Sequence, residues 1–125
     1  MGATFIDINP STPLSTQLSE PPSFGPCILV NTFHIPPGKM EAAFAAWKID
    51  ADLAKKQPGF VSTQLHRAVG GSDMMLNYAV WESTAALKAF YETDDFKESL
   101  ENYPEGTESR IVVYRKQAIE GVCVA

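Results

Sequence analysis

The chain is poor in the residues that build metal sites and disulfide frameworks. Its 125 residues include only two cysteines and two histidines. Cys27 and Cys123 are too few for a disulfide scaffold. His34 and His66 lack the spacing of zinc ligands and would need added carboxylates to hold a metal. We therefore expect no metal, no structural disulfide, and a reduced, cytoplasmic protein.

Basic residues and long apolar runs are also scarce. Ten Lys and Arg stand against fifteen Asp and Glu, which gives a formal net charge of −5. Nucleic acids and anionic membranes bind basic surfaces, so neither is an expected partner. No apolar run approaches the roughly 20 residues of a membrane span. No Lys or Arg precedes Lys39, so we expect no secretory signal at the N-terminus.

The sequence does contain the material of one packed domain. Hydrophobic residues make up 45% of the chain, which is enough for a single core. Residues 1–26 differ from the rest because Ser, Thr and Pro dominate them. Their scattered bulky apolar residues need a cover, so we expect an N-terminal arm packed on the domain or on a partner subunit. The domain itself is expected to span residues 27–125.

The apolar pattern predicts four strands and two helical regions. Alternation and turn residues predict strands at residues 27–35, 60–69, 74–81 and 109–118. Helical spacing predicts helices at residues 39–57 and 83–92, the second continuing at 94–103. Ser83 and Thr93 are suitable N-caps. The resulting order is the ferredoxin-like βαββαβ arrangement of the α+β class, with a four-stranded antiparallel sheet covered by helices on one face.

One stretch joins the end of a strand to the start of a helix: Asn77-Tyr78-Ala79-Val80-Trp81-Glu82-Ser83. Side chains alternate along a strand, so the Asn77 amide and the Trp81 indole share a face. This stretch resembles the signature of the antibiotic biosynthesis monooxygenase (ABM) family. Its surroundings are similar too, with Pro58-Gly59-Phe60 opening one strand, Leu65-His66-Arg67 within it, and Pro36-Pro37-Gly38 before the first helix. The resemblance covers residues from about 27 to about 116 and implies a homodimeric α/β barrel.

The resemblance also implies a reaction. Biosynthetic members of the family oxygenate aromatic polyketides without metal, flavin or haem, so a quinol- or anthrone-like aromatic, molecular oxygen and no cofactor are expected. Triplet oxygen reacts slowly with closed-shell molecules, so the deprotonated substrate must supply the electrons. The protein then needs a base, hydrogen-bond donors and a dry pocket. His66 is the predicted base because its ordinary pKa is near neutrality, and Asn77 and Trp81 are the predicted donors.

The substrate is expected between the sheet and the helices. Asn31 shares a strand face with Phe33, and strand 27–35 should lie beside strand 74–81 in this topology. Apolar walls would hold the rings of a flat ligand and amides would hold its oxygens. The predicted substrate-binding residues are Asn31, Phe33, Trp47, Tyr78, Phe90, Tyr91 and Phe96.

Each catalytic candidate also has a structural interpretation. A strand-end tryptophan such as Trp81 is more often a core residue, Asn77 can satisfy backbone groups, and His66 can be an ordinary strand histidine. A non-catalytic dimeric module for small-molecule binding or protein interaction is therefore the alternative hypothesis. Haem binding or degradation is a third, disfavoured because Leu100 stands about where haem-degrading relatives have their axial histidine. Leu87 also replaces a tyrosine of biosynthetic members.

The second face of the sheet is expected to be apolar and to close against a copy of itself. Thr63 and Leu65 alternate with His66, and we assign them to this open face and His66 to the helix-covered face. Two short helices can cover only one face, so an isologous two-fold interface would bury the other.

Overall fold

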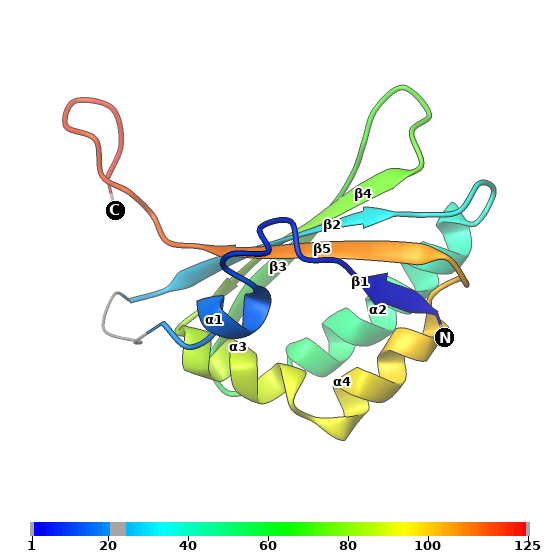
Figure 1. The fold of residues 1–125 in the computed structure, drawn as a ribbon, viewed down its shortest axis with the longest axis horizontal. Coiled ribbons are helices and arrows are strands. Elements are labelled where there is room, and N and C mark those ends of the chain that lie inside the picture. The colour runs from blue at the N-terminus through cyan, green and yellow to red at the C-terminus, as the bar shows by residue number, and fades with distance from the viewer. Residues whose placement is uncertain (1, 21–24, 125) are drawn as a thin grey trace.

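The computed structural model describes residues 2–20 and 25–124, in which the helices pack on one face of a single twisted sheet (Figure 1). The elements in chain order are β1 (Ala3–Phe5), α1 (Leu14–Gln17), β2 (Cys27–His34), α2 (Met40–Ala54), β3 (Phe60–Arg67), β4 (Met74–Trp81), α3 (Thr84–Tyr91), α4 (Asp94–Ser99), the 3-10 turn η2 (Leu100–Asn102) and β5 (Thr107–Tyr114). Within the described residues, no helix has the length and apolar character needed to cross a membrane.

The sheet confirms the ferredoxin-like α+β fold and adds one strand to it. The strand order is β1-β5-β2-β4-β3, and the last four strands of that order pair antiparallel. β1 pairs parallel with β5, so that Ala3 lies opposite Thr107. The described part of the sheet is thus five-stranded rather than four-stranded, because the N-terminal arm supplies an edge strand. Residues 21–24 of the predicted arm lie outside the described residues.

The predicted helix caps form at the expected residues. The Ser83 hydroxyl accepts a hydrogen bond from the Ala86 N–H at 3.1 Å at the start of α3. The Thr93 hydroxyl accepts one from the Phe96 N–H at 3.2 Å at the start of α4. Each cap satisfies an N–H group that the first helical turn leaves without a backbone partner. β4 therefore passes directly into α3, which fixes the position of Trp81.

Gly59 holds the start of β3 against α3. Its φ of 85° is in the left-handed region, and a Cβ at this position would lie 2.5 Å from the Ala86 Cβ. Its carbonyl oxygen accepts a hydrogen bond from the Glu82 N–H at 2.8 Å. Glycine is therefore required here by both the backbone conformation and the available space.

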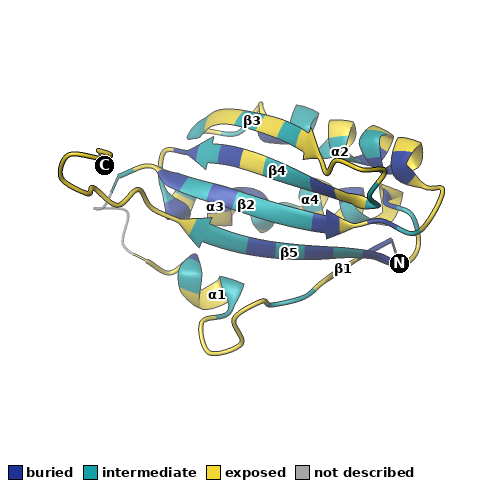
Figure 2. Cartoon of the chain, turned by 90° about the horizontal axis from the view of Figure 1, so that it is seen from above, coloured by how far each residue is buried: buried dark blue, intermediate teal, exposed yellow. Residues whose placement is uncertain are grey.

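The core consists of two clusters between the sheet and the helices. Trp81, Leu87 and Phe90 belong to the first cluster, and Phe33 and Tyr103 to the second. The arm contributes a buried residue to each, Leu18 from the end of α1 and Ala3 from β1. Figure 2 shows the sheet from its open face, with buried residues alternating along the central strands. The described part of the arm is consequently built into the core.

A β-bulge near the start of β3 reverses the predicted faces of that strand. Phe60 and Ser62 pair with successive residues of β4, so Val61 is an extra residue in the register. A bulge of one residue shifts the alternation by one. Phe60 and Thr63 therefore both face the helices, and His66 faces the open side. The prediction that placed Thr63 on the open face and His66 beneath the helices is wrong for this reason.

The end of β3 shows the same orientation. Leu65 packs against the second core cluster. The Arg67 guanidinium carbon lies 5.8 Å from the centre of the Phe44 ring of α2, a cation–π contact. Leu65, which the sequence assigned to the open face, thus points toward the helices.

Candidate functional site

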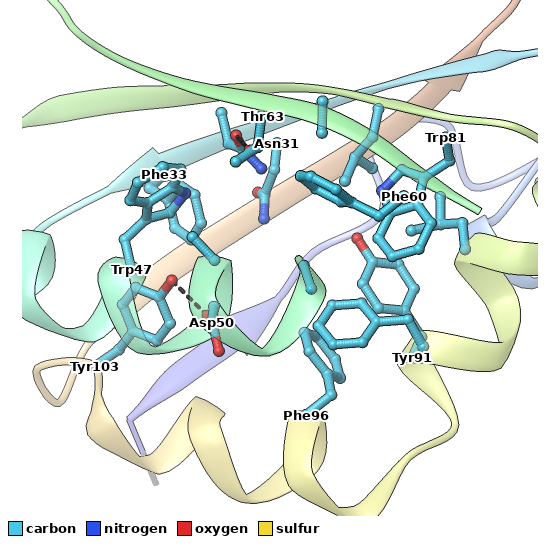
Figure 3. A pocket seen from close by; sticks show the side chains of 17 residues that line it. Asn31, Phe33, Trp47, Asp50, Phe60, Thr63, Trp81, Tyr91, Phe96 and Tyr103 are labelled. Atoms are coloured by element: carbon cyan, nitrogen blue, oxygen red, sulfur yellow. Dashed lines mark hydrogen bonds between the residues drawn. The ribbon is translucent and has the colours of Figure 1, made fainter. Parts of the chain in front are cut away.

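An aromatic-lined cavity lies between the sheet and the helices beside the Asn77–Ser83 stretch (Figure 3). Its volume is about 50 Å³. An apolar cavity of roughly 150 Å³ is needed to hold one benzene ring, so this space takes only part of an aromatic ligand. Its aromatic walls are Phe33, Trp47, Phe60, Trp81, Phe90, Tyr91, Phe96 and Tyr103.

Trp81 is fixed among other rings at one end of the cavity. Its ring packs edge-on to Phe60, with centroids 5.4 Å apart, and stacks on Phe90 at 5.5 Å. The side chain is only 2% exposed. Aromatic pairs of this kind contribute about 0.5–1.5 kcal/mol each beyond their burial. Trp81 is therefore a core residue and a wall of the cavity at once.

Two amides from neighbouring strands lie across from each other on the cavity's sheet side. Asn31 of β2 pairs in register with Asn77 of β4. The Asn77 Oδ1 atom accepts a hydrogen bond from the Thr63 hydroxyl at 2.6 Å, and the Asn31 Oδ1 atom accepts one from the Ser109 hydroxyl at 2.8 Å. Because each bond engages the amide oxygen, the amide N–H groups are the donors offered to a ligand.

Asp50 of α2 brings a half-buried carboxyl group to the same cavity. Its carboxylate accepts hydrogen bonds from the Tyr103 hydroxyl at 2.7 Å and from the Ser99 hydroxyl. Burial raises the pKa of Asp50 above its ordinary value, and the two hydrogen bonds partly offset this shift. Burial and the nearby Asp50 charge raise the pKa of Tyr103 as well. Asp50 is the only carboxyl among the described residues that line the cavity.

A larger groove opens beside the cavity, between the N-terminal arm and α4. Its volume is about 410 Å³, within the range of about 300–1,000 Å³ that is common for small-molecule sites. Phe5 and Leu14 of the arm form one side of it, and Leu100 and Ile111 contribute from η2 and β5. The residues that line both spaces are Asn31, Phe33, Asp50, Tyr91, Phe96 and Tyr103. The cavity and the groove therefore meet at the polar residues.

Eight of the ten predicted site residues line the cavity. The two exceptions, His66 and Tyr78, lie on the open face of the sheet beside Thr32. Tyr78 follows Asn77 along an unbroken strand, so alternation turns it away, whereas the bulge turns His66 away. The predictions of His66 as the base and of Tyr78 as a substrate-binding residue are thus inconsistent with this geometry.

The site predictions also omitted nine residues that line the cavity, among them Phe60, Thr63, Asp50 and Tyr103. Thr63 was missed because the bulge changes its face, whereas Phe60 precedes the bulge, lies on the face that alternation assigns to the helices, and was simply not chosen. Asp50 and Tyr103 were not predicted because a contact between a helix and a distant turn leaves no local pattern in the sequence. One signal was present: Asp50 lies three residues after Trp47, on the core-facing stripe of its helix. Among the described residues, no group of three or more His, Cys, Asp or Glu side chains could hold a metal ion.

Comparison with protein families gives one match. The model of the antibiotic biosynthesis monooxygenase family matches residues 26–102. The matched range includes Asn31, Asp50, Asn77 and Trp81 and leaves the arm outside. No curated protein sequence matches the chain significantly.

Several solved structures share the fold. A candidate monooxygenase from Shewanella loihica PV-4 is 31% identical with a TM-score of 0.64, over 75% of this chain and 96% of its own. SnoaB, a cofactor-independent oxygenase from Streptomyces nogalater, is 20% identical with a TM-score of 0.70, over 78% of this chain and 98% of its own. A candidate antibiotic biosynthesis monooxygenase from Caulobacter crescentus CB15 is 21% identical with a TM-score of 0.66, over 75% of this chain and 92% of its own.

Proposed function

The chain belongs to the antibiotic biosynthesis monooxygenase family, and from that membership we propose that it is a cofactor-independent monooxygenase of a quinol- or anthrone-like aromatic molecule. The family match confirms the resemblance carried by the Asn77–Ser83 stretch. One observation carries the proposal: Asn77 and Trp81 line a cavity that is also lined by the half-buried carboxyl of Asp50. SnoaB, which shares the fold, is a cofactor-independent oxygenase.

The proposed reaction needs no reductant besides the substrate. An anthrone loses both hydrogens of its ring methylene and gains a carbonyl oxygen there. The substrate gives four electrons to O₂, so that one oxygen atom enters the product and the other leaves as water. Deprotonation comes first, because the delocalised carbanion can transfer an electron to triplet oxygen and the neutral molecule cannot do so readily.

In this proposal Asp50 takes the role that the sequence assigned to His66. A carboxylate with a raised pKa accepts a proton from a carbon acid more readily than an ordinary aspartate. The Tyr103 and Ser99 hydroxyls hold the carboxylate in place. The negative charge that develops on the substrate oxygen is stabilised by the amide N–H groups of Asn31 and Asn77. The aromatic walls limit the access of water.

Oxygen uptake tests the proposal. With anthrone as substrate, the protein should consume oxygen faster than buffer does, and Asn77→Ala and Trp81→Phe should lower the rate. Asp50→Asn should lower kcat/KM by about 10²- to 10⁴-fold, the usual contribution of a general base. His66→Gln is the matched control, since His66 faces away from the cavity, and it should retain activity. Equal rates with protein and with buffer across a panel of anthrones and quinols would instead favour the non-catalytic binding module.

We also propose that two copies pair through the open face of the sheet. Val112, Val30 and Tyr78 lie side by side on three adjacent strands of that face. Tyr78 and Tyr114 are 40% and 50% exposed. A contiguous apolar face of this kind commonly marks an interface. An isologous interface of about 1,600 Å² is a typical size for a stable pair.

A further inference from the structure

The outer wall of the groove is made by a part of the chain that the family match does not include. The match begins at residue 26, whereas Phe5, Leu14 and Leu18 of the arm line the groove. The solved structures align over nearly their whole length but over only 75–78% of this chain. The groove is therefore bounded partly by this chain's own addition to the family domain.

The arm is attached to the domain at several points along its length. β1 forms a parallel pair with β5. The Gln17 Oε1 atom accepts a hydrogen bond from the Val113 N–H at 2.7 Å. Near the end of the arm, the buried Thr84 hydroxyl donates to the Glu20 carbonyl oxygen at 2.7 Å. The groove thus has a wall in a defined position.

Most side chains that line the groove are apolar, and its only charged groups among the described residues are two carboxyls. Its apolar side chains include Phe5, Leu14, Phe96, Leu100 and Ile111. Asp50 lies at the junction with the cavity, and Asp7 accepts a hydrogen bond from the Leu14 N–H at 3.1 Å. None of the described residues that line the groove is Lys, Arg or His. An anionic ligand would lack a cation here and would meet two carboxyl groups, so the groove selects against it.

The volumes of the cavity and the groove indicate that a ligand would occupy both spaces. The cavity, about 50 Å³, is too small for a whole ring system, and the groove, about 410 Å³, is not. The Asn31 amide, the Asp50 carboxyl group and the Tyr103 hydroxyl lie where the spaces meet, whereas the second donor, Asn77, lines the cavity alone. A reacting ring at this junction would direct any substituent into the groove.

We propose that the groove binds an uncharged apolar substituent of the aromatic substrate, such as a prenyl chain or an additional ring. This inference rests on the proposed function, because it takes the reacting ring to lie at the junction. The arm then determines which substituted aromatics the protein accepts.

Quenching of tryptophan fluorescence measures this preference without turnover, since Trp47 and Trp81, the two tryptophans of the chain, both line the cavity. The probes are menadione, menadione with a prenyl group on its free quinone carbon, and menadione with a carboxybutyl group there. All proteins carry Cys123→Ser, because the exposed Cys123 thiol would add to the free carbon of menadione. The prenyl compound should bind at least about tenfold tighter than menadione, since each fully buried methylene contributes about fourfold. The carboxybutyl compound should bind no tighter than menadione.

A charge placed in the groove should change this order. Ser15 is exposed and lines the groove, whereas the next residue, Thr16, is exposed and does not. Ser15→Lys should weaken binding of the prenyl compound by about fivefold, because the ammonium group must be desolvated. It should strengthen binding of the carboxybutyl compound by about fivefold, because the two charges pair. Thr16→Lys, the matched control on the same helix, should change neither affinity by more than about twofold.

The outcomes separate this inference from the proposed function. Equal affinities for menadione and its prenyl derivative, or equal effects of Ser15→Lys and Thr16→Lys, would overturn the groove assignment alone. No quenching by any of the three quinones would overturn both proposals. The predicted affinity order without oxygen uptake from anthrones or quinols would support the groove and contradict the monooxygenase.

Discussion

At the scale of single residues, Asp50 combines burial with two hydroxyl partners. Burial favours the neutral carboxyl, so the folded protein holds its proton more tightly than the unfolded chain, where the ordinary pKa is 3.8. A folded-state pKa above the unfolded value gives a stabilising contribution that is fully present below the ordinary pKa. This contribution is lost as the pH rises through the folded-state pKa. Above the folded-state pKa, an ionised Asp50 carboxylate at the junction of cavity and groove therefore lowers the stability of the fold.

This linkage predicts how Asp50→Asn changes the pH dependence of folding. The free energy of unfolding of the wild type, minus that of Asp50→Asn, should fall as the pH rises from about 4 to about 7. Each unit by which the folded-state pKa is raised corresponds to about 1.4 kcal/mol of this difference. Urea unfolding followed by tryptophan fluorescence at several pH values measures it.

Asp52 provides the control on the same helix. This carboxyl is exposed, and its hydrogen bond from the Lys48 ammonium at 2.7 Å lowers its pKa. The corresponding difference for Asp52→Asn should therefore change in the opposite direction with pH. Parallel stability profiles for the wild type and Asp50→Asn would contradict the assignment of a raised pKa to Asp50.

At the scale of elements, β4 and β3 show where sequence reasoning succeeds and where it stops. β4 pairs without interruption, so alternation placed Asn77 and Trp81 correctly on one face. In β3 the extra residue is Val61, an ordinary strand residue with no glycine to mark a bulge. Just before the bulge, Gly59 lies against α3 and Phe60 packs on Trp81, contacts that a single sequence does not reveal.

Contacts between elements far apart in the chain were the other feature that the sequence did not predict. The direction of Asp50 follows from helical spacing, but its partners Ser99 and Tyr103 are 49 and 53 residues away. β1 is only three residues long and lies in a segment rich in Ser, Thr and Pro. The composition predicted an arm, yet only its pairing with β5 makes that arm a strand.

The arm also protects the edge of the sheet, which leads to a prediction for Gln17. β1 covers only the first part of β5, and farther along the Gln17 side chain accepts the hydrogen bond of the Val113 N–H. Gln17→Leu should lower the free energy of unfolding by about 1–3 kcal/mol, since it leaves a partly buried donor without its partner. Gln17→Glu keeps an acceptor for the Val113 N–H and should lower the free energy of unfolding by less, although it loses the hydrogen bond to the Thr12 carbonyl oxygen.

Hydrogen exchange gives a local check of the same contact. The Val113 amide should exchange faster in Gln17→Leu than in the wild type, while the amides of β2 and β4 should change little. An unchanged exchange rate at Val113 would show that the Gln17 side chain does not protect this edge in solution.

At the scale of the whole molecule, the two faces of the sheet differ in what covers them. The helices and the arm cover one face, and the other carries Ile28, Val30, Val80 and Val112 with no element of the described chain over it (Figure 2). Burial of about 1,600 Å² would be a large gain at about 25 cal/mol per Å², although association consumes much of it. The proposed pair therefore follows from the same sheet that carries the site.

Light scattering at micromolar concentration tests the pair. The wild type should give twice the 13.7 kDa mass of one chain. Val30→Lys should give the single-chain mass, because it places an unpaired charge in the middle of the apolar row. Ala45→Lys, at an exposed position of α2, is the control and should remain paired. A mass of 13.7 kDa for the wild type would contradict the proposal.

The pairing of β1 with β5 also sets an order of assembly during protein synthesis. β1 precedes the other described strands in the chain, and its partner β5 follows them. Joining segments so far apart in the chain carries a high loop-closure entropy, so we expect this pair to form after the other strands have packed. The nascent protein would then pack its helices first, and the arm that forms the wall of the groove would be added only after β5 has been synthesised.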